Sequence, residues 1–210
     1  GRKNDYEIYS YIEEVNTVKE EKAKHLIDVM TELHIRTTTY KEYSLDEIKE
    51  GCSFAHKLGK KIYLTLNIVM HNEDLEGLED YIDKVVKCGI DAFIVSDPCI
   101  ISYIVDNYAE VEAHLSTQNS TSNYKAIEFF EKEGVDRVVL ARELSKKQIA
   151  EIVKKVGVDI EVFIHGAMCT CFSGRCALSN YVTNRDANRG GCAQVCRFSF
   201  LSWQNSSLPR

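Results

Sequence analysis

The sequence predicts an α/β protein of the (β/α)8 type, the TIM barrel. Two observations carry this prediction. Within residues 44–166, short β-rich runs alternate with segments of helical periodicity, and repeated βα units imply a parallel sheet covered by helices. Polar residues directly follow each run, as at the mouth of a barrel, whereas a doubly wound sheet carries them mainly at its switch point. No Gly-rich phosphate loop follows any run, so a nucleotide-binding Rossmann fold has little support.

Five runs rich in β-branched and aromatic residues are expected to be strands. They cover residues 61–66, 91–95, 111–115, 137–140 and 161–164. The clearest helix is expected at residues 73–88, where apolar residues recur on one face. This stripe consists of Leu75, Leu78, Ile82 and Val85. Two further helix starts have the spacing of a capping box, namely Ser44 with Glu47 and Ser145 with Gln148.

The chain is expected to divide into three parts. Residues 1–36 read as a charged helical segment, residues 37–166 as a partial barrel and residues 167–210 as a Cys-rich segment that binds a metal or cluster. Eight βα units usually need about 250 residues, and five units can be placed after residue 44. The barrel is therefore expected to be incomplete at its N-terminus, and the chain to be a fragment or to receive the missing elements from elsewhere.

Composition points to a cytoplasmic globular protein. Of the 210 residues 44% are apolar and 28% are charged, which suits one domain with a sizeable core. No apolar run approaches the roughly 20 residues that a membrane helix needs, and residues 1–11 lack the apolar core of a signal peptide. Because cytosolic thiols stay reduced, the eight cysteines are expected to be ligands or nucleophiles rather than disulfides.

Five cysteines fall within 28 residues of the C-terminal part. These are Cys169, Cys171, Cys176, Cys192 and Cys196. Thiolates are soft metal ligands, and the accompanying glycines let the backbone turn tightly around a bulky centre. Zinc more often takes two pairs of closely spaced cysteines, whereas six residues separate Cys169 from Cys176 and fifteen separate Cys176 from Cys192. The spacing favours an iron–sulfur cluster, with zinc and simple reduced thiols as alternatives.

Residues 165–197 resemble the signature of the collagenase-like peptidase family U32. The resemblance rests on the run from His165 to Cys169, the run from Ser173 to Tyr181 and the run from Arg185 to Arg197. Further family-like motifs lie upstream, at residues 63–67, 71–75, 94–98, 114–118 and 138–145. The similarity covers roughly residues 37–200, and several motifs in the family's order make coincidence improbable.

The resemblance implies a (β/α)8 barrel and an iron–sulfur-dependent, oxygen-independent hydroxylase. Family members of this kind act on the wobble uridine of tRNA, with prephenate as hydroxyl donor, or on ubiquinone precursors. Modification of the tRNA wobble uridine is the expected function. A collagenase-like peptidase and an inactive truncated member are the alternatives. Expected partners are tRNA or a small prephenate-like carboxylate, with a hetero- or homo-oligomer and no membrane.

The resemblance also implies the ligands of a 4Fe-4S cluster. Cys169, Cys176 and Cys192 match the family motif. The fourth family cysteine usually lies beyond the point where this sequence ends, so Cys196 is expected to take its place. Cys171 stands where relatives vary and is expected to be a spare thiol.

Polar residues after the predicted strands supply the remaining candidates. His165, Glu143 and His114 are the expected catalytic residues, with a histidine hydrogen-bonded to a neighbouring loop as the competing interpretation of each histidine. The expected substrate-binding residues are Asn67, Gln118, Arg142, Arg175 and Arg197. Arg142 suits a carboxylate and Glu143 suits the orientation of a base, although an internal salt bridge explains this pair nearly as well. The sequence has neither a His-Glu-x-x-His zinc helix nor a Gly-x-Ser-x-Gly elbow, so proteolysis has little local support.

Overall fold

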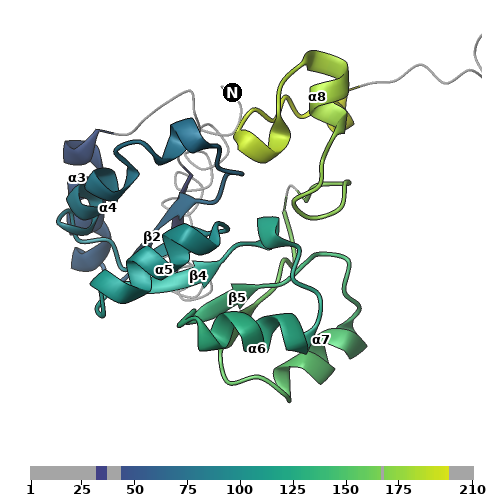
Figure 1. The fold of residues 1–210 in the computed structure, drawn as a ribbon, viewed down its shortest axis with the longest axis horizontal. Coiled ribbons are helices and arrows are strands. Elements are labelled where there is room, and N and C mark those ends of the chain that lie inside the picture. Colours follow the sequence, from purple (N-terminus) through teal and green to yellow (C-terminus); the bar gives the residue numbers. More distant parts are fainter. Residues whose placement is uncertain (1–31, 37–43, 167, 199–210) are drawn as a thin grey trace, which may run out of the picture.

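Six parallel strands form one sheet in the computed structural model, which describes residues 32–36, 44–166 and 168–198 (Figure 1). The strands are β1 (Glu32–Arg36), β2 (Lys61–Leu66), β3 (Ala92–Val95), β4 (Glu112–Leu115), β5 (Arg137–Val139) and β6 (Asp159–Glu161). Each strand pairs with the next one along the chain. This consecutive order has no reversal, unlike a doubly wound sheet, so the predicted parallel α/β architecture is confirmed.

Two strands differ from the prediction. β1 lies inside the segment 1–36 that was expected to be helical, and residues 1–31 of that segment lie outside the described residues. β6 ends at Glu161, so it shares one residue with the predicted strand 161–164. Its register is set by pairing of Arg137 with Asp159 and of Val138 with Ile160, and pairing outweighs the higher β-propensity of the residues that follow.

Helices follow each of the strands β1 to β5. They are α3 (Leu45–Lys57), α4 (Leu78–Val86), α5 (Pro98–Asn107), α6 (Tyr124–Lys132) and α7 (Lys146–Val153). Both predicted capping boxes are confirmed at the starts of α3 and α7. The predicted helix 73–88 is two pieces, the 3₁₀ turn η1 (Asn72–Leu75) and α4. Gly77 separates them because its φ of 71° is left-handed and ends the helical path.

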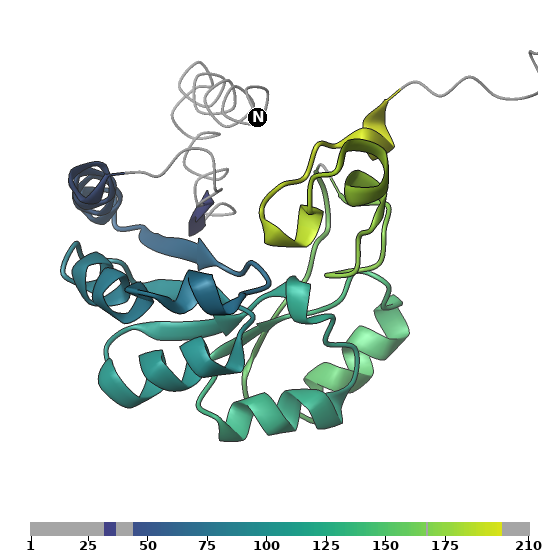
Figure 2. The same ribbon diagram turned by 45° about the horizontal axis from the view of Figure 1, so that its top comes forward.

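The main core lies between helices α3 to α7 and one face of the sheet (Figures 1 and 2). Ile62 and Leu64 of β2 point into this core and are fully buried. Tyr63, between them, points to the other face, where it packs with Ala92 and Ile94. Each fully buried Ile or Leu contributes about 1.5–3 kcal/mol, so the helical layer fixes the sheet. None of the helices in the described ranges is both long and apolar enough to cross a membrane.

The Cys-rich segment follows β6 and contains three short elements. They are α8 (Leu178–Thr183), η3 (Ala187–Arg189) and η4 (Val195–Arg197). In both views this segment lies apart from α3 to α7, on the side of the molecule that the helices leave uncovered (Figures 1 and 2). Residues 199–210 of the predicted segment 167–210 lie outside the described residues.

Candidate functional site

Polar side chains after β2, β3 and β4 hydrogen-bond to one another. The amide Nδ2 of Asn67 donates to Oγ of Ser116 at 2.7 Å, and Nδ2 of Asn119 donates to the carbonyl oxygen of Ser96 at 3.2 Å. The carboxyl ends of parallel strands share one edge of a sheet, which explains why these residues meet. The predicted substrate contact Asn67 therefore has its amide group committed to Ser116.

Arg142, after β5, holds the start of the Cys-rich loop. Its Nη2 donates to the carbonyl oxygen of Cys171 at 2.8 Å, and its Nη1 donates to the carbonyl oxygen of Cys169. Its backbone N–H donates to Oγ of Ser173 at 3.1 Å. One guanidinium thus bridges two turns of the loop, a use that suits its planar fork of donors.

Glu143 holds the same loop through a second residue. Its Oε1 accepts hydrogen bonds from the backbone N–H of Ser173 at 2.8 Å and from Oγ of Ser173 at 3.2 Å. Desolvation alone would raise the pKa of Glu143, but these hydrogen bonds outweigh it and hold the pKa below its usual value. The predicted pair Arg142 and Glu143 therefore anchors the loop instead of forming a salt bridge with each other.

Gly174 brings the loop against the end of β4. Its φ is 66°, and a Cβ atom at this position would overlap the carbonyl oxygen of Gln118. The close approach places the predicted substrate residue Gln118 directly against the Cys-rich segment. Only glycine fits here without displacing backbone.

A clamp joins the end of the Cys-rich segment to the loop after β2. Nη1 of Arg189 donates to Oδ2 of Asp74 at 2.7 Å and to the carbonyl oxygen of Val69 at 2.9 Å. The backbone N–H of Val69 donates to the carbonyl oxygen of Asn188 at 2.9 Å. The N–H of His71, followed by the Arg189 guanidinium, lowers the pKa of Asp74. We call the contacts of Asp74, Val69, Asn188 and Arg189 the β2-loop clamp.

Asn188 also ties the segment to one of its own cysteines. Its Oδ1 accepts from the N–H of Cys176 at 3.2 Å, and its Nδ2 donates to the carbonyl oxygen of Cys176 at 2.9 Å. The Asn188 side chain thus accepts from and donates to the backbone of Cys176, as a neighbouring strand would, and these two hydrogen bonds fix the backbone at Cys176. The predicted ligand Cys176 is thus linked through Asn188 to the β2-loop clamp.

Four thiols form one group around Cys171, whose pKa the other three affect. They belong to Cys169, Cys171, Cys176 and Cys196, and all the cysteines of the described residues are free. The hydrogen bond between Cys171 and Cys176, with burial and the neighbouring thiolate charges, raises the pKa of Cys171. Burial would raise the pKa of Cys176 too, but hydrogen bonds from the N–H of Ser179, from the Cys171 thiol and from the N–H of Leu178 lower it. The thiolate, the form that binds metals, is therefore more accessible at Cys176 than at Cys171.

These four thiols are of the kind that holds an iron–sulfur cluster, because cluster iron is bound by cysteine thiolates. The pKa of one of them, Cys176, is lowered. Across residues 44–166 and 168–198, no three histidine, cysteine or carboxylate side chains are arranged to bind one metal ion. Binding would thus require the sulfur atoms to converge. The predicted ligand Cys192 is exposed, and its sulfur accepts from the N–H of Gln194 at 3.4 Å.

A pocket of about 220 Å³ opens where the loop meets the end of β5. Its lining consists of Arg142, Glu143, Cys169, Thr170, Cys171 and Phe172. The pocket therefore combines two predicted strand-end residues with one predicted cluster ligand. Cys171 and Phe172 were not predicted to belong to it. In the sequence, Phe172 directly follows the Cys-Thr-Cys run and directly precedes the Ser-Gly-Arg-Cys run. This position was the signal by which it could have been found.

The remaining predicted residues lie outside the pocket lining. His165 is exposed and precedes the loop. Arg197 is exposed, and its Nη2 donates to the carbonyl oxygen of Met168 at 3.2 Å, while Arg175 is exposed on the loop itself. Ser173, Asp74 and Asn188 hold the segment in place and were not predicted. No local pattern marks them, because their partners lie far away in the sequence.

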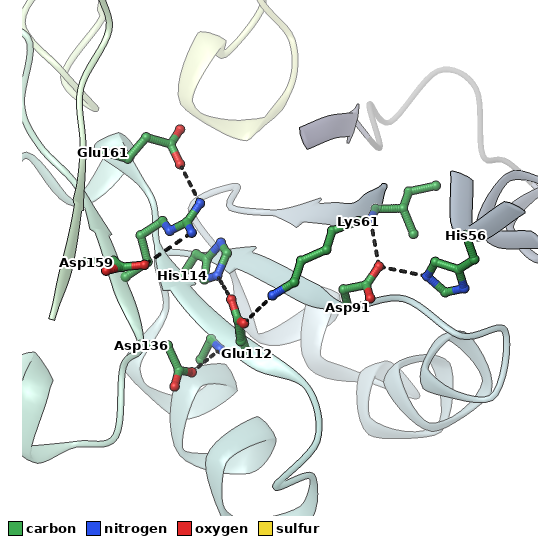
Figure 3. Close-up of polar contacts among 11 residues, drawn as sticks. His56, Lys61, Asp91, Glu112, His114, Asp136, Asp159 and Glu161 are labelled. Atoms are coloured by element: carbon green, nitrogen blue, oxygen red, sulfur yellow. Dashed lines mark hydrogen bonds and ion pairs between the residues drawn. The ribbon is translucent and has the colours of Figure 1, made fainter. Parts of the chain in front are cut away.

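His114 is the third of the four residues of β4 and lies on the same face of the strand as Glu112, two residues earlier. It is fully buried, its Nε2 is 2.7 Å from Oε2 of Glu112, and its ring packs edge-on against Tyr63. Figure 3 shows this pair with Lys61, whose Nζ is 2.7 Å from Oε1 of Glu112. Desolvation would raise the pKa of Glu112, but hydrogen bonds from Lys61 and His114 lower it. His114 is therefore absent from the pocket lining and lies on the sheet face that carries Tyr63.

Comparison with known proteins identifies the kind of chain. The profile of Peptidase family U32 matches residues 11–207. A tRNA hydroxylation protein P1 from Bacillus subtilis (strain 168) is 52% identical over 162 residues, which are 77% of this chain and 38% of that protein. A 23S rRNA 5-hydroxycytidine C2501 synthase from Escherichia coli (strain K12) is 40% identical over 157 residues, which are 75% of this chain and 24% of that protein.

The fold has a counterpart among solved structures. The U32 peptidase Mk0906 superposes with a TM-score of 0.55 at 14% identity, covering 66% of this chain and 64% of that one. At this identity the likeness concerns the fold alone. This chain spans less than two fifths of the length of the two relatives above.

Proposed function

This chain belongs to peptidase family U32, and we propose that it acts in an iron–sulfur-dependent, oxygen-independent hydroxylation of RNA, with the wobble uridine of tRNA as substrate. The observation that carries the proposal is the 52% identity to the tRNA hydroxylation protein P1 of Bacillus subtilis. The match to an rRNA hydroxycytidine synthase supports RNA as the substrate class. Both relatives are longer than this chain, so we propose the hydroxylation activity for this chain only on the strength of the part that it shares with them.

The cysteines of the Cys-rich segment would hold the cluster. Cys169, Cys176 and Cys196 belong to the four-thiol group, and Cys192 completes the set that the family motif implies. A 4Fe-4S cluster supplies electron transfer close to the substrate when bound. Arg142 and Glu143 would act as positioning residues, because they fix the loop that carries Cys169 and Cys171.

Hydroxylation of a uridine replaces a ring C–H by C–OH, which is a two-electron oxidation of the base. Without O₂ we propose a prephenate-like dicarboxylate as the donor of the oxygen atom, and this donor also accepts the two electrons, so that it is reduced as it gives up its hydroxyl oxygen. Exposed guanidinium groups suit its carboxylates and the phosphates of RNA. Arg175 and Arg197 are the exposed arginines among residues 168–198, whereas the Arg142 guanidinium is committed to two carbonyl oxygens.

The sheet would be an arc of a larger structure. Six consecutive parallel strands with helices on one face are what part of a (β/α)8 barrel provides. We infer that the remaining elements close the barrel around the face that carries Tyr63 and His114. A pair of chains working together in the cytoplasm is compatible with this arrangement.

The experiment uses a Bacillus subtilis strain that lacks tRNA hydroxylation protein P1. The chain is expressed in this strain, and tRNA nucleosides are quantified by mass spectrometry. Restored hydroxylated wobble uridine, lost again in a Cys176→Ser variant, is the expected result. Iron and acid-labile sulfide are measured on protein purified without oxygen. Zinc in place of iron, with no restored hydroxylation, would contradict the proposal.

Proteolysis is the second candidate, favoured by one observation. The exposed thiol of Cys169 lines a pocket, which is where a nucleophile would stand. A peptidase should cleave gelatin and lose that activity on alkylation of Cys169. A chain that neither cleaves gelatin nor hydroxylates tRNA would correspond to the inactive family member.

A further inference from the structure

A tight turn presents an aromatic ring and a cation at the rim of the pocket. The N–H of Arg175 donates to the carbonyl oxygen of Phe172 at 3.2 Å, which closes a four-residue turn. The left-handed Gly174 stands at the third position, as a type II turn requires. Both ends of the turn are exposed, Phe172 to 69%. An exposed phenylalanine and an exposed arginine therefore stand at the two ends of one turn.

The two middle residues of this turn are held in place by the rest of the protein. The two end residues are therefore exposed as a consequence of the fold. Ser173 is fully buried and is bonded to both Arg142 and Glu143. Gly174 lies against the backbone of Gln118. A ring on a rigid turn loses little conformational entropy when it binds a partner. We call residues 172–175 the recognition turn.

The charge around the turn suits a polyanion. Residues 168–198 contain four arginines, no lysine and one acid, Asp186, in a chain whose net charge is −6. Arg189 is committed to Asp74, and Arg197 donates to a carbonyl oxygen. Among the described residues the Arg175 side chain has no ion-pair or hydrogen-bond partner. A cation beside an exposed ring is the combination that binds a nucleotide through its phosphate and its base.

We propose that the recognition turn binds one unpaired nucleotide of an RNA loop, with the Phe172 ring stacked on its base and the Arg175 guanidinium on its phosphate. This inference rests on the proposed function and names the residues that would position the RNA. The pocket beside Phe172 measures about 220 Å³, below the roughly 300–1,000 Å³ of pockets that enclose a whole drug-sized ligand. It has room for part of a nucleotide and places that part beside the thiol of Cys169.

The test measures binding of the full chain, purified without oxygen, to a fluorescent anticodon stem-loop that carries an unmodified wobble uridine. Phe172→Leu keeps an apolar side chain but loses the stacking face, whereas Phe172→Tyr keeps it. Phe54→Leu, on α3, removes an equally exposed phenylalanine (65%) from the helical layer and is the matched control. A fully paired duplex of similar length is the control RNA.

Phe172→Leu is expected to weaken stem-loop binding about 5- to 150-fold, since one base–aromatic stack is lost. Phe172→Tyr and Phe54→Leu should bind like the unmodified chain, and duplex binding should not depend on Phe172. Arg175→Ala should reduce the slope of log K against log salt by about 0.7, the share of one phosphate on a single strand. Phe172→Leu should leave that slope unchanged.

Stem-loop binding that is equal in Phe172→Leu and the unmodified chain would overturn the inference, as would an absence of stem-loop binding. Displacement of the RNA by denatured collagen, itself dependent on Phe172, would assign the turn to peptides instead. Restored tRNA hydroxylation that Phe172→Leu does not reduce would sink this inference alone. Phe172-dependent binding without any hydroxylation would sink the proposed function and leave the turn as an RNA-binding element.

Discussion

Arg142 reaches from the end of β5 to the Cys-rich loop and donates a 2.8 Å hydrogen bond to the carbonyl oxygen of Cys171. The same guanidinium donates to the carbonyl oxygen of Cys169. A rigid sheet therefore sets the spacing between the first two cysteines of the loop. Metal sites depend on such outer contacts, because they orient the groups that bind the metal.

Arg142→Lys should weaken metal binding while the chain stays folded. Lysine keeps the charge but lacks the planar fork that holds two carbonyl oxygens at once. Loss of an outer contact typically costs about 10- to 100-fold in metal affinity. The measurement is the iron retained by anaerobically prepared protein at increasing chelator concentration. Iron retention equal to that of the unmodified chain, with an unchanged unfolding midpoint, would show that Arg142 does not position the loop.

Gly174→Ala should destabilise the chain more than Gly59→Ala. Both glycines have a φ of 66°, so both substitutions carry the left-handed strain of about 1–2 kcal/mol. Only at position 174 does the new Cβ overlap the backbone of Gln118, whereas nothing lies within 4 Å of a Cβ at position 59. The overlap should add about 1–3 kcal/mol. Urea unfolding of the two variants measures the difference, and equal midpoints would mean that the loop is not docked on β4.

The parallel architecture follows from the sequence because each strand pairs with its chain neighbour. Spacing of βα units is enough to predict such a sheet. The limits of β6 do not follow, since Phe163 and Ile164 have stronger β-propensity than Asp159 and Glu161 yet are exposed. Pairing with β5 decides the register, and a single sequence does not display that pairing.

The candidate site, like the fold, could be predicted from the sequence only in part. The clustering of cysteines and the polar ends of strands are visible as local patterns, and the structure places Arg142 and Glu143 against the loop of Cys169. The β2-loop clamp joins Asp74 to Arg189, 115 positions apart. No local pattern encodes this contact.

The β2-loop clamp should open in acid. The pKa of Asp74 is lowered in the folded chain from its usual value of 3.8. The charged carboxylate therefore contributes stability above about pH 3.8, and this contribution is lost as the pH falls through the lower, folded value. Hydrogen exchange at the amide of Val69, which is bonded to Asn188, reports whether the clamp is closed.

Asp74→Asn should give fast Val69 exchange already at neutral pH, because the ion pair with Arg189 is absent. The expected loss is roughly 1–2 kcal/mol, the value of a charged hydrogen bond that is partly exposed. Lys125→Gln, which breaks the exposed pair with Glu128 on α6, is the control and should leave Val69 unaffected. Slow exchange in Asp74→Asn would mean that backbone contacts alone hold the segment.

His114→Phe should lower stability while leaving the pocket intact. Phenylalanine keeps an aromatic ring against Tyr63 but removes the partner of Oε2 of the partly buried Glu112 carboxylate, whose Oε1 stays paired with Lys61. An uncompensated polar group of this kind costs about 1–3 kcal/mol. Thermal unfolding measures the loss, and mass spectrometry of tRNA measures hydroxylation in the complemented strain. Abolished hydroxylation at unchanged stability would instead support the catalytic role predicted for His114.

Serine substitutions should separate cluster ligands from other thiols. Cys169→Ser, Cys176→Ser and Cys196→Ser each remove one member of the four-thiol group, and each should lose most of the bound iron and sulfide. Cys99→Ser removes an exposed thiol at the start of α5 and should retain full iron content. Cys192→Ser and Cys171→Ser form the decisive pair, because the family motif favours Cys192 as a ligand whereas Cys171 is hydrogen-bonded to Cys176. Iron lost from Cys192→Ser and kept by Cys171→Ser is the expected result. The reverse would place Cys171 in the cluster and leave Cys192 as the exposed spare thiol.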